Sequence, residues 1–140
     1  MNDSIDWYAL TAVLLFLKML AISLYQGFHR IRNRRFVTPE DAALIGRPAA
    51  TEELPQVQRA SQAWRNDLEN IPIFLALGVA YILVDASATA AAWLFPIFTA
   101  ARYLHTAFYL SGLQPWRTIA YAVGILCTFG LCGGILNKIF

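Results

Sequence analysis

The 140-residue chain is 58% hydrophobic and only 14% charged, with a net charge of +2 and a mean hydropathy of +0.49. Soluble domains carry about 25% charged residues and about 45–50% apolar ones. A soluble chain this short has too little interior to hide the excess of apolar residues. The composition excludes a disordered chain and a disulfide-stapled mini-protein. It predicts an integral membrane protein.

The apolar residues fall into four segments, which are too long for barrel strands of about 9–11 residues and lack strict alternation. The predicted helices span about residues 7–28, 62–84, 88–111 and 116–137, and a loop of about residues 29–61 separates the first two. The first segment follows acidic residues and lacks a cleavage site, so we expect it to be retained rather than removed as a signal peptide. The sequence thus predicts an all-α membrane protein, a four-transmembrane-helix bundle forming a single domain over residues 1–140.

Basic residues gather in two of the predicted connections. The first and third connections hold seven arginines: Arg30, Arg32, Arg34, Arg35, Arg47, Arg59 and Arg117. The opposite side holds the acidic Asp3, Asp6 and Asp85, with Lys138 as its only basic residue. Following the positive-inside rule, we expect the arginine-rich connections in the cytoplasm and both termini on the opposite side.

Polar residues of the four segments lie at the predicted cytoplasmic ends of the helices: Arg30, Arg65, Asn66, Glu69, Asn70, His105, Tyr109, Arg117 and Tyr121. At about 100° per residue, Arg102, His105 and Tyr109 share one helix face. A charge within a membrane usually faces the bundle interior or an aqueous cavity. The sequence therefore predicts a polar cleft among the helices.

Several cations and one carboxylate in such a cleft suit a small zwitterionic anion. Arginines hold carboxylates with two parallel hydrogen bonds, and Glu69 suits an ammonium group. Arg117 and Thr118 begin a helix, where a further anion such as a thiolate fits. Each unit by which a thiol pKa falls takes about 1.36 kcal/mol of preferential anion binding. An arginine with a hydroxyl donor supplies on the order of 1.4–2.7 kcal/mol of this stabilisation, enough to lower the thiol pKa by one to two units. The lipid-facing walls of the cleft would admit a hydrophobic second substrate.

Structural roles compete with these assignments. Arg65 and Glu69 are four residues apart, so they either bind a ligand or form an ion pair. The arginines that follow the first segment serve either topology and lipid headgroups or a ligand. His105 either binds a ligand or donates a structural hydrogen bond, and we expect Lys18 to snorkel or to pair within the bundle. Cys127 and Cys132 sit in an apolar stretch and are expected only to pack, so no metal site is predicted.

The same residues carry a resemblance to a known family. Residues 65–71 (RNDLENI), followed by Phe74 and Leu75, resemble the second-helix signature of the MAPEG superfamily, the membrane-associated proteins in eicosanoid and glutathione metabolism. Residues 101–110 (ARYLHTAFYL) resemble its third-helix motif, (G/A)R-x-x-HT-x-x-YL. Residues 39–42 (PEDA) and Pro115-x-Arg117 with Tyr121 also fit, in the right order. The nearest branches are the microsomal glutathione transferases and prostaglandin E synthases.

The resemblance implies a homotrimer that binds glutathione as a cosubstrate between adjacent subunits, near the cytoplasmic side and without a metal. It assigns glutathione binding by one subunit to Arg65, Asn66, Glu69, His105, Tyr109, Arg117 and Tyr121. Arg30 would reach in from the neighbour. Arg117 would stabilise the thiolate with the help of Thr118, Asp41 would work with that arginine, and Arg102 would orient the cleft. The chain departs from the family pattern at Gln62, where relatives usually have an arginine, and at Trp64.

The leading hypothesis from the sequence is a glutathione transferase that activates the thiolate for attack on hydrophobic electrophiles or for peroxidase-type reduction of lipid hydroperoxides. One alternative is a glutathione-dependent isomerase of prostaglandin-type endoperoxides, and another is a non-catalytic lipid-binding scaffold of the same superfamily. The expected partners are glutathione, a hydrophobic electrophile or lipid, membrane lipids and two further copies of the chain, with no nucleic acid. A bacterial inner membrane and an endoplasmic reticulum membrane both fit.

Overall fold

The computed structural model describes residues 4–140, and within them the chain forms only α-helices and turns, with no strand. The helices are α1 (Ser4–Asn33), α2 (Pro39–Leu44), α3 (Pro55–Leu83), α4 (Ala88–Ser111) and α5 (Trp116–Ile139). The all-helical prediction is confirmed. Asp3, one of the acidic residues used to orient the chain, lies outside the described residues.

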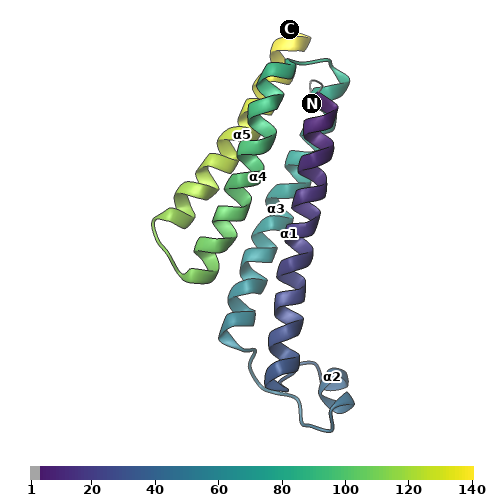
Figure 1. Cartoon of the computed structure of the whole chain (residues 1–140), viewed down its shortest axis with the longest axis vertical. Helices are drawn as coiled ribbons and strands as arrows, with labels where there is room; N and C mark the ends of the chain where they lie inside the picture. The colour runs from purple at the N-terminus through teal and green to yellow at the C-terminus, as the bar shows by residue number, and fades with distance from the viewer. Residues whose placement is uncertain (1–3) are drawn as a thin grey trace.

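The four long helices run side by side (Figure 1). α1 packs against α3 and α4, and α5 packs against α3 and α4. The N- and C-terminal ends lie at one end of the molecule, and α2 lies at the other, below the lower ends of α1 and α3 (Figure 1). The turn between α4 and α5 ends well short of α2, so α1 and α3 project beyond the α4–α5 hairpin.

The long connection after α1 is more ordered than the sequence suggests. α3 begins at Pro55, whereas the hydropathy pattern places its start at about residue 62. Proline at the first helical position suits a helix start, since it lacks only an N–H that would be unpaired there. Val57, Ala60 and Ala63 are fully buried, so the added turns have an apolar face of their own. α2 also lies within the stretch predicted to be a loop.

An aromatic cluster joins α3 to α4. The rings of Phe74 and Phe98 stack with centroids 3.5 Å apart, and Phe95 meets Phe74 edge to face at 5.6 Å. All three side chains are buried, and such ring pairs add to the stabilisation that burial of their area provides. This cluster fixes the two helices just beyond the polar residues described below.

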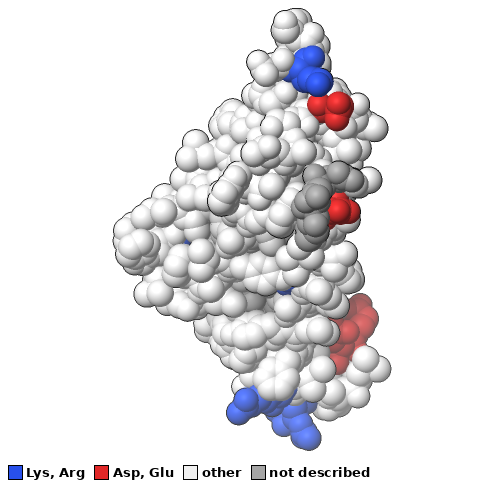
Figure 2. All heavy atoms as spheres, turned by 45° about the horizontal axis from the view of Figure 1, so that its top comes forward, with Lys and Arg blue, Asp and Glu red and all other residues white. Residues whose placement is uncertain are grey.

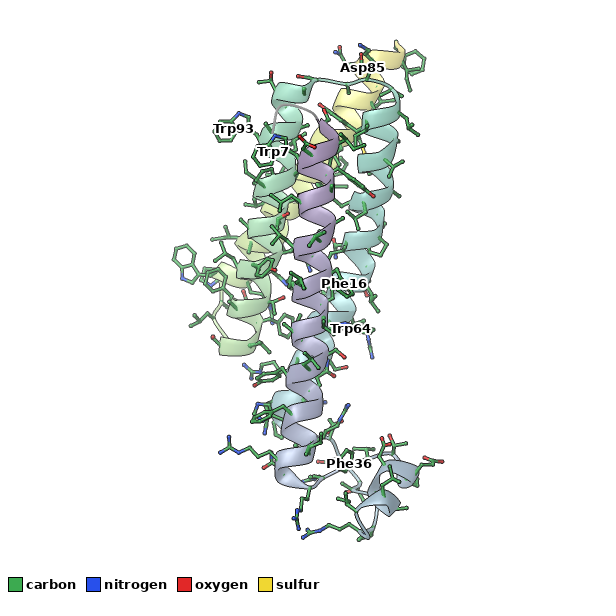
Figure 3. The ribbon with its side chains drawn as sticks, turned by 45° about the vertical axis from the view of Figure 1, so that its right-hand side comes forward. Trp7, Phe16, Phe36, Trp64, Asp85 and Trp93 are labelled. Carbon is green, nitrogen blue, oxygen red and sulfur yellow. The ribbon has the colours of Figure 1, made fainter. Side chains whose placement is uncertain are left out.

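Within residues 4–140, three helices, α1, α3 and α5, are long and apolar enough to cross a membrane. α4 is not among them, so four spans stay a prediction. In Figure 2, a broad and mainly white area lies between the blue groups at the two ends of the face. Trp7 and Trp93 lie toward the end that carries Asp85, and Phe36 lies at the end that carries α2 (Figure 3). Tryptophan is enriched at membrane–water interfaces.

Candidate functional site

A polar pocket of about 260 Å³ opens where α3, α4 and α5 meet. Six side chains line it: Asn66, His105, Tyr109, Arg117, Thr118 and Tyr121. The sequence assigns all six to one ligand-binding cleft, and the structure brings them together from three helices.

The turn between α4 and α5 places Arg117 against the end of α4. α4 ends at Ser111, and the next residue, Gly112, adopts a left-handed conformation with φ of 70°. The N–H of Leu113 then donates to the carbonyl of Phe108 at 2.9 Å, which closes the helix in the manner of a glycine C-cap. Since the chain reverses here, the first turn of α5 lies beside the last turns of α4, and Arg117 faces His105 and Tyr109 across the pocket.

Two neighbours hold the Arg117 guanidinium in place. Its Cζ lies 4.6 Å from the centroid of the Tyr109 ring, a cation–π distance. When the Gln114 amide is assigned with its oxygen toward the guanidinium, which satisfies both of its polar atoms, it accepts hydrogen bonds from Nη2 and Nε of Arg117 at 2.5 and 3.1 Å. The nitrogen of the same amide donates to Oγ1 of Thr118 at 3.0 Å. Arg117 and Thr118 are thus linked through one side chain.

His105 and Tyr109 form the α4 wall of the pocket. His105 is only 3% exposed, and its ring centroid lies 5.7 Å from that of Tyr109 and 6.4 Å from that of Tyr121. Its Nδ1 has no hydrogen-bond partner among residues 4–140. The Tyr109 hydroxyl donates to Oε1 of Gln62 at 3.1 Å, so Gln62, which departs from the family pattern, sits at the pocket edge. A buried imidazole nitrogen without a protein partner can hydrogen-bond a bound ligand.

A buried charge network lies behind the pocket and joins α1, α3 and α4. Asp67 accepts from Nζ of Lys18 through one carboxylate oxygen and from Nη2 and Nε of Arg102, at 2.6 and 3.1 Å, through the other. Arg102 Nη2 also donates to Oδ1 of Asn66 at 2.6 Å. Lys18, Asp67 and Arg102 are 4%, 0% and 1% exposed. Of the two expected roles of Lys18, snorkelling or pairing within the bundle, the structure shows the pairing.

Asp67 is not among the predicted site residues. One signal was present: Lys18 and Arg102 are two charges inside apolar segments, and charges at membrane depth pair with one another. Two acidic residues, Asp67 and Glu69, lie at the start of the predicted second segment and are candidate partners for these two cations. The structure selects Asp67, which faces inward, over the exposed Glu69.

Four of the predicted site residues do not line the pocket of the single chain. Arg65 and Glu69 are exposed on α3, and no ion pair joins them in the described part of the chain. Arg30 binds Glu53 through Nη2 and Nε at 2.6 and 2.8 Å. Asp41 is exposed on α2. Within residues 4–140, no group of histidine, cysteine and acidic side chains is placed to hold a metal.

An apolar groove of about 410 Å³ runs between α4 and α5. Its walls include Leu104, Phe108 and Trp116, which are adjacent in sequence to the pocket residues His105, Tyr109 and Arg117. The same two helices therefore carry a polar pocket and an apolar groove on different faces.

Comparison with known proteins gives consistent matches. The sequence model of the MAPEG family matches residues 8–137. Microsomal glutathione S-transferase 1 of Mus musculus is 34% identical over 98% of this chain and 92% of its own length. Prostaglandin E synthase of Homo sapiens is 35% identical over 89% of this chain and 83% of its own length. Microsomal glutathione S-transferase 1 of Homo sapiens is 32% identical over 94% of this chain and 88% of its own length.

Proposed function

Because the chain belongs to the MAPEG family, we propose that it is a glutathione-dependent membrane transferase. It would activate the glutathione thiolate for attack on hydrophobic electrophiles, for reduction of lipid hydroperoxides, or for both. Relatives whose names state glutathione transfer align with nearly the whole chain, which supports this reaction class.

The pocket around Arg117 is the observation that carries the proposal. It brings together six of the ten predicted site residues at a point where a fixed cation meets a hydroxyl group at a helix start. The Tyr109 ring and the Gln114 amide orient the guanidinium without neutralising its charge. The positive charge therefore remains available to an anion in the pocket.

In the proposed reaction, the thiol of glutathione loses its proton to solvent, and the sulfur anion lies against Arg117 and Thr118. The sulfur then forms a bond to the electrophilic carbon of the second substrate, whose leaving group departs with the bonding electron pair. Each unit of thiol pKa depression takes about 1.36 kcal/mol, so one arginine and one hydroxyl suffice for a shift of one to two units, on the order of 1.4–2.7 kcal/mol. The apolar groove between α4 and α5 offers a hydrophobic substrate a surface on the same helices.

We further propose that the active protein is a homotrimer. Glutathione carries two carboxylates and an ammonium, and the pocket of one chain offers it a single cationic side chain. Arg65 and Glu69 lie exposed on α3 beside Asn66, available to the remaining charged groups. Arg30, in the last turn of α1, and Asp41, on α2, would come from a neighbouring copy.

α4 is the fourth proposed span. Its Arg102 and His105 lower its mean hydropathy, but both side chains are buried inside the bundle, at 1% and 3% exposed. Lipid would therefore meet its other, mainly apolar faces. Four crossings place both termini on one side, opposite the arginine-rich connections, which the positive-inside rule assigns to the cytoplasm.

The direct test is glutathione conjugation of an aryl halide by detergent-purified protein. We expect Arg117→Ala to lose most of the turnover of the wild type, about 10- to 100-fold, because the thiolate loses the one to two units of pKa depression that the fixed cation and the hydroxyl supply. Arg47→Ala removes an exposed arginine that does not line the pocket and should keep wild-type turnover. A wild-type protein that neither binds nor turns over glutathione would contradict the proposed function.

A second candidate, endoperoxide isomerisation, is favoured by the relatives named prostaglandin E synthase. It differs from the first in needing no release of a glutathione conjugate. In the single chain, Asp41 is exposed on α2 and is not among the residues that line the Arg117 pocket, so the expected pairing of these residues requires a neighbour. Product analysis with an endoperoxide substrate separates the two reactions.

A further inference from the structure

Asn66 connects the buried charge network to the pocket. Its Oδ1 accepts a hydrogen bond from Nη2 of Arg102 at 2.6 Å, and its side chain lines the pocket. A side-chain amide has one acceptor atom and one donor atom on opposite sides of the same carbon. Because the acceptor is occupied by Arg102, the Nδ2 donor points away from the network.

The Nδ2 of Asn66 has no hydrogen-bond partner within the part of the chain that the structure describes. The neighbouring Asn70 instead uses its own Nδ2 to bind the backbone carbonyl of Asn66, at 2.7 Å. Asn66 therefore offers the pocket a hydrogen-bond donor, and a donor suits an anionic acceptor.

The orientation of Arg102 depends in turn on Asp67. One carboxylate oxygen of Asp67 accepts hydrogen bonds from Nε and Nη2 of Arg102, while the other accepts one from the Lys18 ammonium. Asp67, itself bonded to Lys18, thus holds the Arg102 guanidinium in one direction, and all three side chains are nearly fully buried. A lysine in place of Arg102 would keep the charge but would lose the planar fork that reaches Asp67 and Asn66 at once.

We propose that Lys18, Asp67 and Arg102 form a positioning network that turns Asn66 so that its amide N–H groups donate to a carboxylate of glutathione. This inference rests on the proposed function, since it names the ligand of the same pocket. The network acts through Asn66 and touches no reacting atom. It also carries two cations against one carboxylate, and this surplus positive charge behind the pocket favours an anionic ligand.

A double-mutant cycle tests whether Arg102 acts through Asn66. Glutathione binding is measured for wild type, Arg102→Lys, Asn66→Ala and the double variant. We expect each single change to weaken binding about tenfold, as for one lost hydrogen bond to a charged group, and the double variant to lose about tenfold in total. KM for glutathione should rise while kcat is largely kept. Losses that multiply to about 100-fold would overturn the inference.

Thr99→Val is the matched control for general loosening of the bundle. The Thr99 hydroxyl is buried on α4, three residues before Arg102; it donates to the carbonyl of Phe95 at 2.9 Å and forms a hydrogen bond with Oγ1 of Thr11 on α1 at 3.2 Å. No hydrogen bond joins it to Asn66 in the described part of the chain. We expect this variant to lower thermal stability and leave glutathione affinity unchanged. A loss of affinity equal to that of Arg102→Lys would assign the effect to loosening and overturn the inference.

Asn66→Asp keeps the test decisive if Arg102→Lys does not fold. The new carboxylate still accepts from Arg102 but presents an oxygen, instead of N–H groups, to the pocket. We expect it to weaken glutathione binding more than Asn66→Ala does, because it repels a carboxylate. Wild-type affinity in Asn66→Asp would overturn the inference alone, whereas no glutathione binding by the wild type would overturn the proposed function and this inference with it.

Discussion

Glycines on α5 leave room for large side chains of the neighbouring helices. A methyl group added at Gly134 would collide with Cε2 of the Tyr81 ring and lie 3.2 and 3.3 Å from its Cζ and hydroxyl oxygen. Tyr81 is 1% exposed and its hydroxyl donates to the carbonyl of Ser87 at 3.0 Å, so the ring has no free space into which to turn. We expect Gly134→Ala to destabilise the protein by about 1–3 kcal/mol, the usual cost of overpacking. Its thermal unfolding midpoint in detergent measures this.

The adjacent residue supplies the control. A methyl group at Gly133 would meet no atom within 4 Å, and alanine favours a helix over glycine by up to about 1 kcal/mol. Gly133→Ala should therefore unfold at the wild-type temperature or slightly above it. Equal destabilisation by both variants would show that the α3–α5 contact at Tyr81 is not as described.

Individual site residues were predictable where a chemical role coincided with helical spacing. His105 and Tyr109 share a face of α4, and Arg117 and Tyr121 share one of α5, so their convergence followed from the periodicity and the turn between them. Asp67 was missed because five of the six residues from 65 to 70 (RNDLEN) are polar. The hydropathy pattern therefore does not reveal which of them faces inward. Only the need of Lys18 and Arg102 for an acidic partner pointed to it.

Helix boundaries were predictable inside the apolar segments and not outside them. The first turns of α3 lie beyond the apolar stretch, and their polar residues hide the short stripe of Val57, Ala60 and Ala63. α2 carries the signs of a helix start, with Pro39 first and Glu40 and Asp41 in the first turn. A helix of six residues has no hydrophobic period long enough to be read from sequence.

Whether α4 crosses the membrane is testable with single cysteines. In a Cys127→Ala, Cys132→Ala background, Arg47→Cys, Ala88→Cys and Ser111→Cys each place one thiol at an exposed position. Four spans predict that a membrane-impermeant maleimide labels positions 47 and 111 from the cytoplasmic side. Position 88 should be labelled only from the opposite side.

Two outcomes of this labelling would contradict the arrangement. Labelling of positions 88 and 111 from the same side would mean that α4 does not cross. Labelling of position 47 from the side opposite the cytoplasm would reverse the orientation that the arginines predict. The cysteine-free background protein controls for labelling of other groups.

At the scale of the whole molecule, the few charged residues lie in two kinds of place. Most lie toward the ends, as Figure 2 shows for one face, and Lys18, Asp67 and Arg102 are buried among α1, α3 and α4. The membrane class followed from composition because it depends only on the amount of apolar material. The assembly did not follow from composition, and in the single chain Arg65, Glu69 and Asp41 are exposed and lie outside the lining of the Arg117 pocket.

The central claim is that the Arg117 pocket binds glutathione as its thiolate. The most direct measurement is a titration of the purified wild-type protein with glutathione, followed by the ultraviolet absorbance of the thiolate. We predict a saturable rise in thiolate absorbance at neutral pH that Arg117→Ala abolishes and Arg47→Ala retains. A wild-type titration without such a rise, or an undiminished rise in Arg117→Ala, would contradict the claim.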